Sequence, residues 1–352
     1  FTLFTFHNTN TTKYYFYYYM SLIKNCIKNK DTTSNPIWLM RQAGRYLPEF
    51  REIRKINQDF IKLCLNENLA SEITLQPIKR FNFDAAIIFS DILMVPHGLG
   101  QKVEFEKNFG PKLGELDLET IYKKNDISFT KDLKQVYKAI SKTSSDTLMK
   151  NKDMIGFVGA PWTILVYMIN RSSPKNGLKS NFYKDKSLIN KLLEIIVKFL
   201  KLHIKNQIDS GAEVIQIFDS WAGLLEDKIP EFIYMPTFNI VKYVKELGVP
   251  VICFPRGIKD YKNFCEIVKP DAINIDYDVN PEKIIKEVKI PVQGGLDPKI
   301  LLTDKVNLRK SVERYLNIFK DHPYIFNLGH GILPETKIEL VEELIKIVRD
   351  FK

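Results

Sequence analysis

The chain has 352 residues, 45% of them hydrophobic, which is long enough for two ordinary domains or for one large α/β barrel. Its 52 basic and 42 acidic residues give a formal net charge of +10, which favours acidic ligands as partners. Nucleic acid is disfavoured because the excess lysines are scattered and accompany no zinc-finger, RNP-like or basic-helix motif, and no apolar run reaches the roughly 18–20 residues of a membrane span.

The first thirty residues differ from the rest of the chain. They contain no Asp or Glu, since the first acid is Asp31, and they are rich in Thr, Asn, Tyr and Phe. This composition is typical of an organellar transit segment with Lys in place of the usual Arg, and equally of a low-complexity tail without an address. We therefore predict a leader or disordered tail over residues 1–35 and one folded domain over residues 36–352.

After residue 35, short β-branched runs alternate with longer stretches of helical periodicity. The predicted strands lie near Ile37–Met40, Ala85–Ser90, Met154–Val158, Val214–Phe218, Pro250–Phe254, Ala272–Asp276, Pro291–Gln293 and Tyr324–Leu328. The predicted helices between and after them include Leu69–Phe81, Ser187–Ser210, Pro230–Leu247, Tyr261–Val268, Pro281–Glu287, Leu308–Phe319 and Thr336–Asp350. Eight such units favour an α/β fold with a parallel sheet, closed as a single-domain (β/α)8 TIM-type barrel.

Two further patterns refine this architecture. No GxGxxG or GxxxxGK[ST] loop follows any predicted strand, which removes the usual indication of an open nucleotide-binding sheet. The alternation over residues 102–106 (KVEFE), flanked by several glycines, predicts a small β-hairpin inserted after the second strand.

The first predicted strand ends in two arginines, Arg41 and Arg45, four residues apart. Only ten of the 52 basic residues are Arg, so solvent-facing basic positions have mostly become Lys. Two arginines at one strand end indicate a need for the planar guanidinium, which pairs through two hydrogen bonds with a carboxylate or phosphate. An ordinary basic turn is the alternative.

Polar residues follow nearly every other predicted strand, and in this architecture function gathers at the carboxyl ends of the strands. Each candidate also has a structural interpretation. Asp91 and Ser220 could cap the helices that follow them, and Tyr167 could belong to the core. His330 lies between two glycines, where the backbone can approach a ligand closely, whereas Asp276 and Asp297 are typical of caps or barrel braces.

The sequence carries no pattern of a metal site. HxH, HExxH and clustered acidic sets are missing, and the four cysteines, Cys26, Cys64, Cys253 and Cys265, show no CxxC or CxH spacing. We therefore predict a reduced compartment with neither a disulfide framework nor a bound metal.

Four separated motifs together resemble the uroporphyrinogen decarboxylase family of haem biosynthesis. They are residues 38–49 (WLMRQAGRYLPE), 89–93 (FSDIL), 156–163 (GFVGAPWT) and 327–332 (NLGHGI). The resemblance covers about residues 36–351 and implies a carboxy-lyase that acts on uroporphyrinogen III, a tetrapyrrole polycarboxylate. Four acetate carboxyl groups would be removed to give coproporphyrinogen III. It also implies a homodimer that needs no cofactor.

The same resemblance implies roles for six residues. Arg41 and Arg45 would pair with substrate carboxylates, and Asp91 would accept hydrogen bonds from the pyrrole N–H groups. Tyr167, Ser220 and His330 would also contact the substrate. The general acid stays open among Arg41, Asp91 through a bound water, and a substrate carboxyl, because a normal Arg has a pKa above about 12.

The chain also departs from the family pattern. Residues 254–257 (FPRG) resemble those of plastid and bacterial members. Together with the leader, this favours a plastid-type organelle over the cytoplasm as the location of the protein. The loop near residue 170, which is usually Gly-rich in the family, has the sequence NRSSPK here. Two other classes compete. A corrinoid-dependent methyltransferase on the same barrel would need His and Cys ligands at strand ends. A non-catalytic tetrapyrrole-binding relative should lack Asp91 or the arginines.

Overall fold

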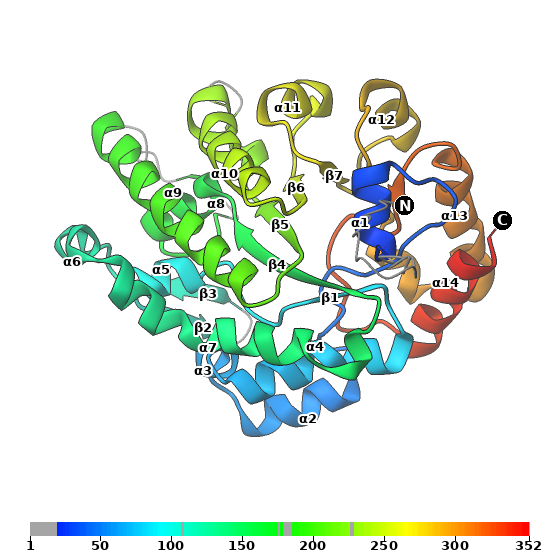
Figure 1. Ribbon diagram of the computed structural model, residues 1–352, viewed down its shortest axis with the longest axis horizontal. Helices are drawn as coiled ribbons and strands as arrows, with labels where there is room; N and C mark the ends of the chain where they lie inside the picture. The colour runs from blue at the N-terminus through cyan, green and yellow to red at the C-terminus, as the bar shows by residue number, and fades with distance from the viewer. Residues whose placement is uncertain (1–19, 107–108, 175–176, 179–184, 226–228, 352) are drawn as a thin grey trace, which may run out of the picture.

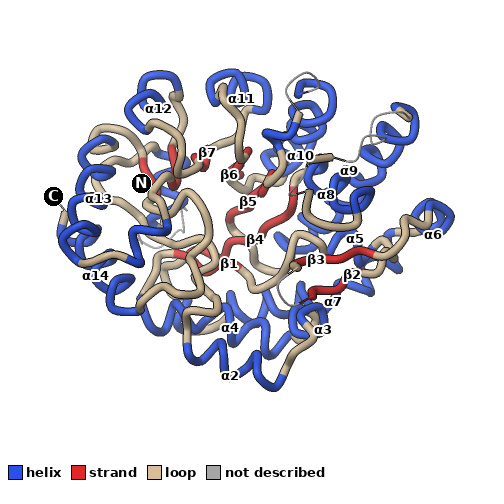
Figure 2. The backbone as a smooth tube through the Cα atoms, turned by 180° about the vertical axis from the view of Figure 1, so that it is seen from behind, coloured by secondary structure: helices blue, strands red, loops and turns tan. Residues whose placement is uncertain are grey.

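The computed structural model describes residues 20–106, 109–174, 177–178, 185–225 and 229–351. Seven parallel strands form one sheet surrounded by helices (Figures 1 and 2). In sheet order these are β1 (Ala85–Ile87), β4 (Asp153–Gly159), β5 (Val214–Asp219), β6 (Val251–Pro255), β7 (Ala272–Ile275), β8 (Val292–Gly294) and β9 (Tyr324–Ile325). Each matches a strand predicted from the sequence.

The remaining predicted strand, Ile37–Met40, closes the barrel without forming a regular strand. It bridges the last strand, where Phe326 N–H donates to the Pro36 carbonyl over 2.8 Å, and it reaches the first, where Asp84 N–H donates to the Ile37 carbonyl over 3.0 Å. Seven strands and this segment give eight positions around the closed sheet. The predicted (β/α)8 barrel is thus confirmed.

Side chains explain why this closing segment is irregular. The N–H groups that a ladder would use are taken by the Asp84 carboxylate (2.7 Å from Ile37 N), the Gln42 amide (3.1 Å from Leu39 N) and the Asn327 amide (2.8 Å from Met40 N). Hydrogen bonds to fixed side chains satisfy the backbone as well as a strand would.

The helices form the outer layer of the barrel. In chain order they are α1 (Leu22–Asn29), α2 (Pro48–Ile56), α3 (Phe60–Cys64), α4 (Glu67–Phe81), α5 (Met94–Gly98), α6 (Leu118–Lys123), α7 (Asp126–Ser144), α8 (Pro161–Asn170), α9 (Lys186–Asp209), α10 (Met235–Glu246), α11 (Tyr261–Val268), α12 (Pro281–Glu287), α13 (Lys305–Ile318) and α14 (Ile338–Asp350). One prediction needs correction, because the helix expected over Pro230–Leu247 is divided into a π-helix, Ile229–Tyr234, and α10. Pro236 lies in the first turn of α10 and has no N–H to continue an α-helical pattern from the preceding residues.

The predicted hairpin insertion is confirmed by strands β2 (Val103–Glu106) and β3 (Gly110–Leu113), which pair antiparallel. Phe105 packs against Phe60 of α3, with ring centroids 4.6 Å apart, and this contact holds the hairpin to the barrel. The unusual segment after residue 170 adds to the hairpin, because Leu113 N–H donates to the Arg171 carbonyl over 2.8 Å.

The prediction of a leader or tail over residues 1–35 does not describe residues 20–35. Residues 22–29 form α1, whose Ile23, Cys26 and Ile27 are buried. These side chains belong to the same apolar cluster as the barrel interior, including Trp38 and Ile155. The composition of the segment concealed its amphipathic pattern, in which the apolar side chains at positions 23, 26 and 27 share one helix face. Residues 1–19 lie outside the described residues.

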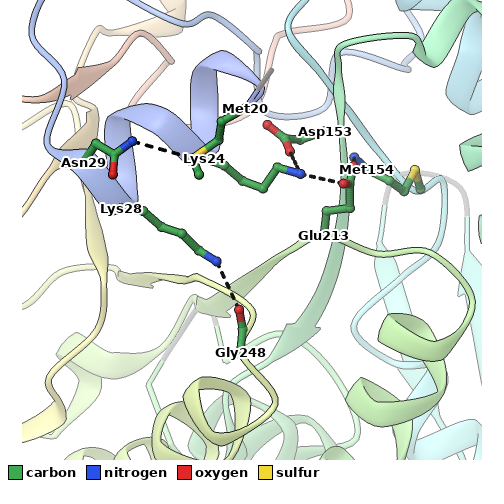
Figure 3. A network of polar contacts seen from close by, with 8 residues as sticks. All are labelled: Met20, Lys24, Lys28, Asn29, Asp153, Met154, Glu213 and Gly248. Carbon is green, nitrogen blue, oxygen red and sulfur yellow. Dashed lines mark hydrogen bonds and ion pairs between the residues drawn. The ribbon is translucent and has the colours of Figure 1, made fainter. Parts of the chain in front are cut away.

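Ion pairs fix α1 to the amino ends of the strands (Figure 3). Lys24 Nζ lies 2.6 Å from Glu213 Oε1 and 3.3 Å from Asp153 Oδ1, where β5 and β4 begin. Lys28 donates to the Gly248 carbonyl, before β6, over 3.2 Å. Burial lowers the pKa of Lys24, but the two carboxylates more than offset this effect and hold its pKa above the usual value. Helix α1 therefore covers the end of the barrel opposite the carboxyl ends of the strands.

We expect the Ile23→Ala variant to lower the free energy of unfolding by about 2 kcal/mol or more, because the substitution leaves a cavity under α1. Ile56→Ala is the matched control, since Ile56 is 85% exposed and its loss should change the free energy by less than about 0.5 kcal/mol. Urea denaturation of both variants measures the difference. Equal stability of the two variants would show that α1 does not contribute to the folded barrel.

Candidate active site

The turn after the closing segment holds Arg41 in an unusual backbone conformation, with φ of 60°. The neighbouring residues impose it. The Met40 carbonyl accepts from Ile332 N–H over 2.9 Å, and the fully buried Gln42 side chain donates to the Ala85 carbonyl over 3.0 Å. A left-handed conformation costs a non-glycine residue about 1–2 kcal/mol. Such strain persists where the surroundings over-determine it, and this is common at binding sites.

The Arg41 side chain lies along the loop that follows β9. A Cβ atom added to Gly331 would lie 2.3 Å from Arg41 Cδ, so the residue at this position must be glycine for the guanidinium to keep its course. This close approach accounts for one of the two glycines that flank His330.

Asp91 follows β1 and is both a turn-forming residue and a member of the site. Its Oδ1 accepts from Leu93 N–H over 2.9 Å, but Leu93 itself is the N-cap residue of α5, so Asp91 holds the preceding turn and does not cap the helix. Burial raises the pKa of this carboxyl to about 6, although the Leu93 hydrogen bond and the positive charge of Arg41 act in the opposite direction. The carboxyl therefore combines a hydrogen bond of the turn with a position close to the Arg41 charge.

Tyr167 and His330 are placed with these two residues. Tyr167 lies on α8, 8% exposed, and burial raises its pKa, as does the Asp91 charge. Burial lowers the pKa of His330 to about 4, helped by the charges of Arg41 and Arg256, so the imidazole is neutral near pH 7. Four different positions of the barrel thus contribute side chains to one region at its carboxyl end, namely Arg41, Asp91, Tyr167 and His330.

Ser220 and Arg45 are the two remaining residues of the predicted site. Ser220 directly follows β5 and is half-buried beside Trp221, whose ring is 6.0 Å from that of Tyr167. Arg45 is exposed, and its charge acts on Arg54 of α2. Burial lowers the pKa of Arg54, and Arg45 lowers it further. Asp59 acts in the opposite direction, so charges of both signs meet at this part of the surface.

Three residues of this region were missed or underused at the sequence level. Arg54 and Arg256 belong to the small set of arginines, and that scarcity was the signal that could have found them. Asp219 ends β5, and burial raises its pKa to about 7 while its Oδ1 accepts from the Thr163 hydroxyl over 2.6 Å. The Thr163 oxygen in turn accepts from Trp221 N–H over 3.1 Å, which positions the loop that carries Ser220.

The two aspartates interpreted as caps or braces make contacts of these two kinds. Asp297 accepts from Lys299 N–H over 2.9 Å at the start of a short 3₁₀-helix, Pro298–Leu302. Asp276 accepts from Arg256 and so links the ends of β7 and β6. In the part of the chain that the structure describes, no group of three or more His, Cys, Asp or Glu side chains could hold a metal ion. No helix among the described residues is long and apolar enough to cross a membrane.

Comparisons with known proteins agree with this geometry. The family model for "Uroporphyrinogen decarboxylase (URO-D)" matches residues 19–351. The uroporphyrinogen decarboxylase of Rickettsia bellii is 43% identical over 340 residues, which is 95% of this chain and 99% of the relative. That of Rickettsia massiliae is 42% identical over 337 residues, 94% of this chain and 97% of the relative. The chain belongs to the uroporphyrinogen decarboxylase family.

The family match confirms the resemblance and the decarboxylase class inferred from the four motifs. It begins at residue 19, which agrees with the inclusion of α1 in the folded domain. Among solved structures, a methyltransferase from Methanosarcina mazei superimposes with a TM-score of 0.76, covering 94% of this chain and 99% of that chain. At 14% identity this likeness concerns the barrel fold alone, and it does not favour the methyltransferase alternative over the decarboxylase family.

We expect Gly331→Ala to lower kcat/KM for decarboxylation by about 10- to 100-fold, because the new methyl group displaces the Arg41 side chain from its course. The substitution adds no charge, so the melting temperature should change far less than the activity. Steady-state kinetics and circular dichroism on one preparation measure both.

The matched control is the same substitution in an Arg41→Ala background. There it should have little further effect, because the side chain that it displaces is already missing. A full additive loss in that background would show that Gly331 acts on something other than Arg41.

Proposed function

We propose that this protein is a uroporphyrinogen decarboxylase that converts uroporphyrinogen III to coproporphyrinogen III without a cofactor. The observation that carries the proposal is the placement of a carboxyl, Asp91, within the field of Arg41 and near enough to Tyr167 for its charge to raise the pKa of that phenol, at the mouth of a barrel of this family. Arginines at the rim suit a substrate whose periphery carries carboxylates.

The proposed chemistry follows from the substrate. Protonation of a pyrrole ring carbon creates a cation that accepts the electron pair of the breaking C–C bond when an acetate carboxyl leaves as CO2. A proton then adds to the exocyclic methylene carbon and makes a methyl group, and the ring carbon loses the proton that it had gained, which restores the neutral aromatic pyrrole. Ionised Asp91 accepts hydrogen bonds from pyrrole N–H groups and stabilises the cation, since a fixed charge in a site shielded from water acts strongly.

Other residues at the mouth of the barrel would bind the rest of the substrate. Arg41 and Arg45 are proposed to bind peripheral carboxylates, and Tyr167 and Ser220 to line the ring. His330 is neutral near pH 7, so it would contact the substrate as a hydrogen-bonding group rather than as a cation.

Two finer properties are also proposed. The first is a homodimer, as the sequence resemblance implies, which analytical ultracentrifugation would test. The second is a plastid-type address, which residues 20–35 would not supply, because they fold with the barrel. The relatives described above are bacterial, so a fluorescent fusion that stays in the cytosol would return the localisation to the cytoplasmic alternative.

The direct test is chromatographic. Purified protein incubated anaerobically with uroporphyrinogen III should release CO2 and give coproporphyrinogen III through partly decarboxylated intermediates. Activity should persist after EDTA treatment and dialysis. Activity that is lost on dialysis and restored by a metal ion or an organic cofactor would contradict the cofactor-free reaction, whereas binding of the tetrapyrrole without product would support the non-catalytic alternative.

We expect Asp91→Asn to lower turnover by at least about a hundredfold, the usual effect of removing one preorganised electrostatic group. The Asn side chain can still accept from Leu93 N–H, so the turn should survive. In the wild type, kcat/KM should fall as the pH drops through about 6, because the carboxylate becomes protonated there.

Stability separates this role from capping. The folded pKa of Asp91 lies above its unfolded value, so the folded state holds the proton more tightly and the carboxyl destabilises it progressively as the pH rises from about 4 through 6. Asp91→Asn removes that effect and should raise the melting temperature above pH 6. A lowered melting temperature with near-normal turnover would assign Asp91 to the turn alone.

A further inference from the structure

Arg256 and Asp276 form an ion pair at the mouth of the barrel, after the neighbouring strands β6 and β7. Arg256 Nε lies 3.0 Å from Asp276 Oδ2, and the two side chains are 32% and 4% exposed. The carboxylate is thus buried, while part of the guanidinium reaches solvent. None of the six roles transferred to this chain from the family motifs involves either residue.

The pair is fixed from below. Asp276 Oδ1 accepts from Tyr277 N–H over 2.8 Å, and its own N–H donates to the Tyr261 hydroxyl over 3.3 Å. The backbone of Arg256 donates to the Asp219 carbonyl and accepts from Gly223 N–H, each over 3.0 Å. Because Asp276 accepts a hydrogen bond from Nε, it fixes the orientation of the planar guanidinium. The two terminal NH2 groups can still donate hydrogen bonds to another partner.

The loop after β9 connects this pair to the candidate active site. On one side of His330, a Cβ atom at Gly329 would lie 2.3 Å from Tyr277 N, next to Asp276. On the other side, Gly331 contacts Arg41. The loop that carries His330 therefore lies between the Arg41 side chain and the backbone beside Asp276. The charges of both Arg41 and Arg256 add to the effect of burial in lowering the pKa of the imidazole.

Sheet order separates these two positions as far as the barrel allows. The closing segment that ends at Arg41 is followed in the sheet by β1, β4, β5 and then β6, which ends before Arg256. Four steps in an eight-position barrel correspond to the opposite wall. Arg41 and Arg256 therefore face the mouth from opposite sides, with His330 on the arc between them.

We propose that Arg256 is a further carboxylate-binding residue of the site and that Asp276 is its positioning residue. The inference rests on the proposed function. A macrocycle with carboxylates around its whole periphery needs cationic partners on both sides of the mouth, and Arg256 supplies one on the wall opposite Arg41 and Arg45. A brace between β6 and β7 is the alternative, and it predicts effects on stability alone.

The experiment compares Arg256→Gln and Arg256→Lys with the wild type. Binding is followed by fluorescence quenching of uroporphyrin III, the stable oxidised form of the substrate, and turnover by KM and kcat for uroporphyrinogen III. Arg256→Gln should raise Kd and KM by about 10- to 100-fold, the scale of a charged hydrogen bond. Arg256→Lys should be intermediate, because it keeps the charge but not the fork.

Arg309→Gln is the matched control, since Arg309 is an exposed arginine paired with Glu313 and Glu343 on the outer helices. It removes one positive charge and should leave Kd and KM unchanged. An equal rise in Arg309→Gln would reduce the effect to net charge and overturn the proposal. If Arg256→Gln left Kd and KM unchanged and lowered only the melting temperature, Arg256 would be a brace between strands, and the carboxylate-binding proposal would be overturned.

Asp276→Asn tests the positioning role. It adds one net positive charge to the mouth, so simple attraction predicts tighter uroporphyrin binding, whereas loss of orientation predicts weaker binding. Weaker binding of uroporphyrin by this variant supports the positioning role of Asp276. Tighter or unchanged binding overturns the proposal that Asp276 positions Arg256. A wild type that neither binds uroporphyrin nor decarboxylates uroporphyrinogen would overturn the proposed function itself, a result distinct from failure of the Arg256 variants alone.

Discussion

The site depends on how the barrel closes. Residues 36–40 occupy one of the eight sheet positions, yet Asp84, Gln42 and Asn327 bind the N–H groups that a regular ladder would use. Because these partners are buried and fixed, the chain must leave the sheet in one conformation, and that exit places Arg41 in the left-handed region. The same hydrogen bonds therefore close the barrel and hold the backbone of Arg41 in its strained conformation. A substitution that weakens them should disturb both the fold and the position of this arginine.

The two ends of the barrel have different tasks. At the carboxyl end, burial raises the pKa of Asp91 and Asp219 and lowers that of His330, so this end carries groups whose charged forms are destabilised. At the other end, α1 covers the interior, and inside the barrel Gln293 joins Trp38, Gln216 and Asn274 in a buried hydrogen-bonded network. Packing and these buried hydrogen bonds away from the mouth offset the cost of the site.

Much of this arrangement could be predicted from the sequence, because the strong periodic signals are local. The strands and most helices follow from β-branched runs and amphipathic spacing, and the rule for strand ends located Arg41, Asp91 and His330. Helix α1 was missed because an acid-free composition outweighed three apolar residues on one face. Arg256 was not singled out, because its partner Asp276 follows a different strand, and no local pattern records that contact.

Electrostatics connects binding with chemistry at the mouth. In the free protein the positive charge of Arg41 helps Asp91 to ionise, and it adds to the effect of burial in favouring the neutral form of His330. A polycarboxylate bound to the arginines would cancel much of that field, so by itself it would push both groups toward protonation. The pyrrole N–H groups counter this at Asp91, because hydrogen bonds donated to the carboxylate favour its charged form. If the protein has the proposed function, Asp91 would stay ionised only when the pyrrole N–H groups of a bound substrate donate hydrogen bonds to it. The charge that stabilises the cation is thereby coupled to correct binding of the substrate.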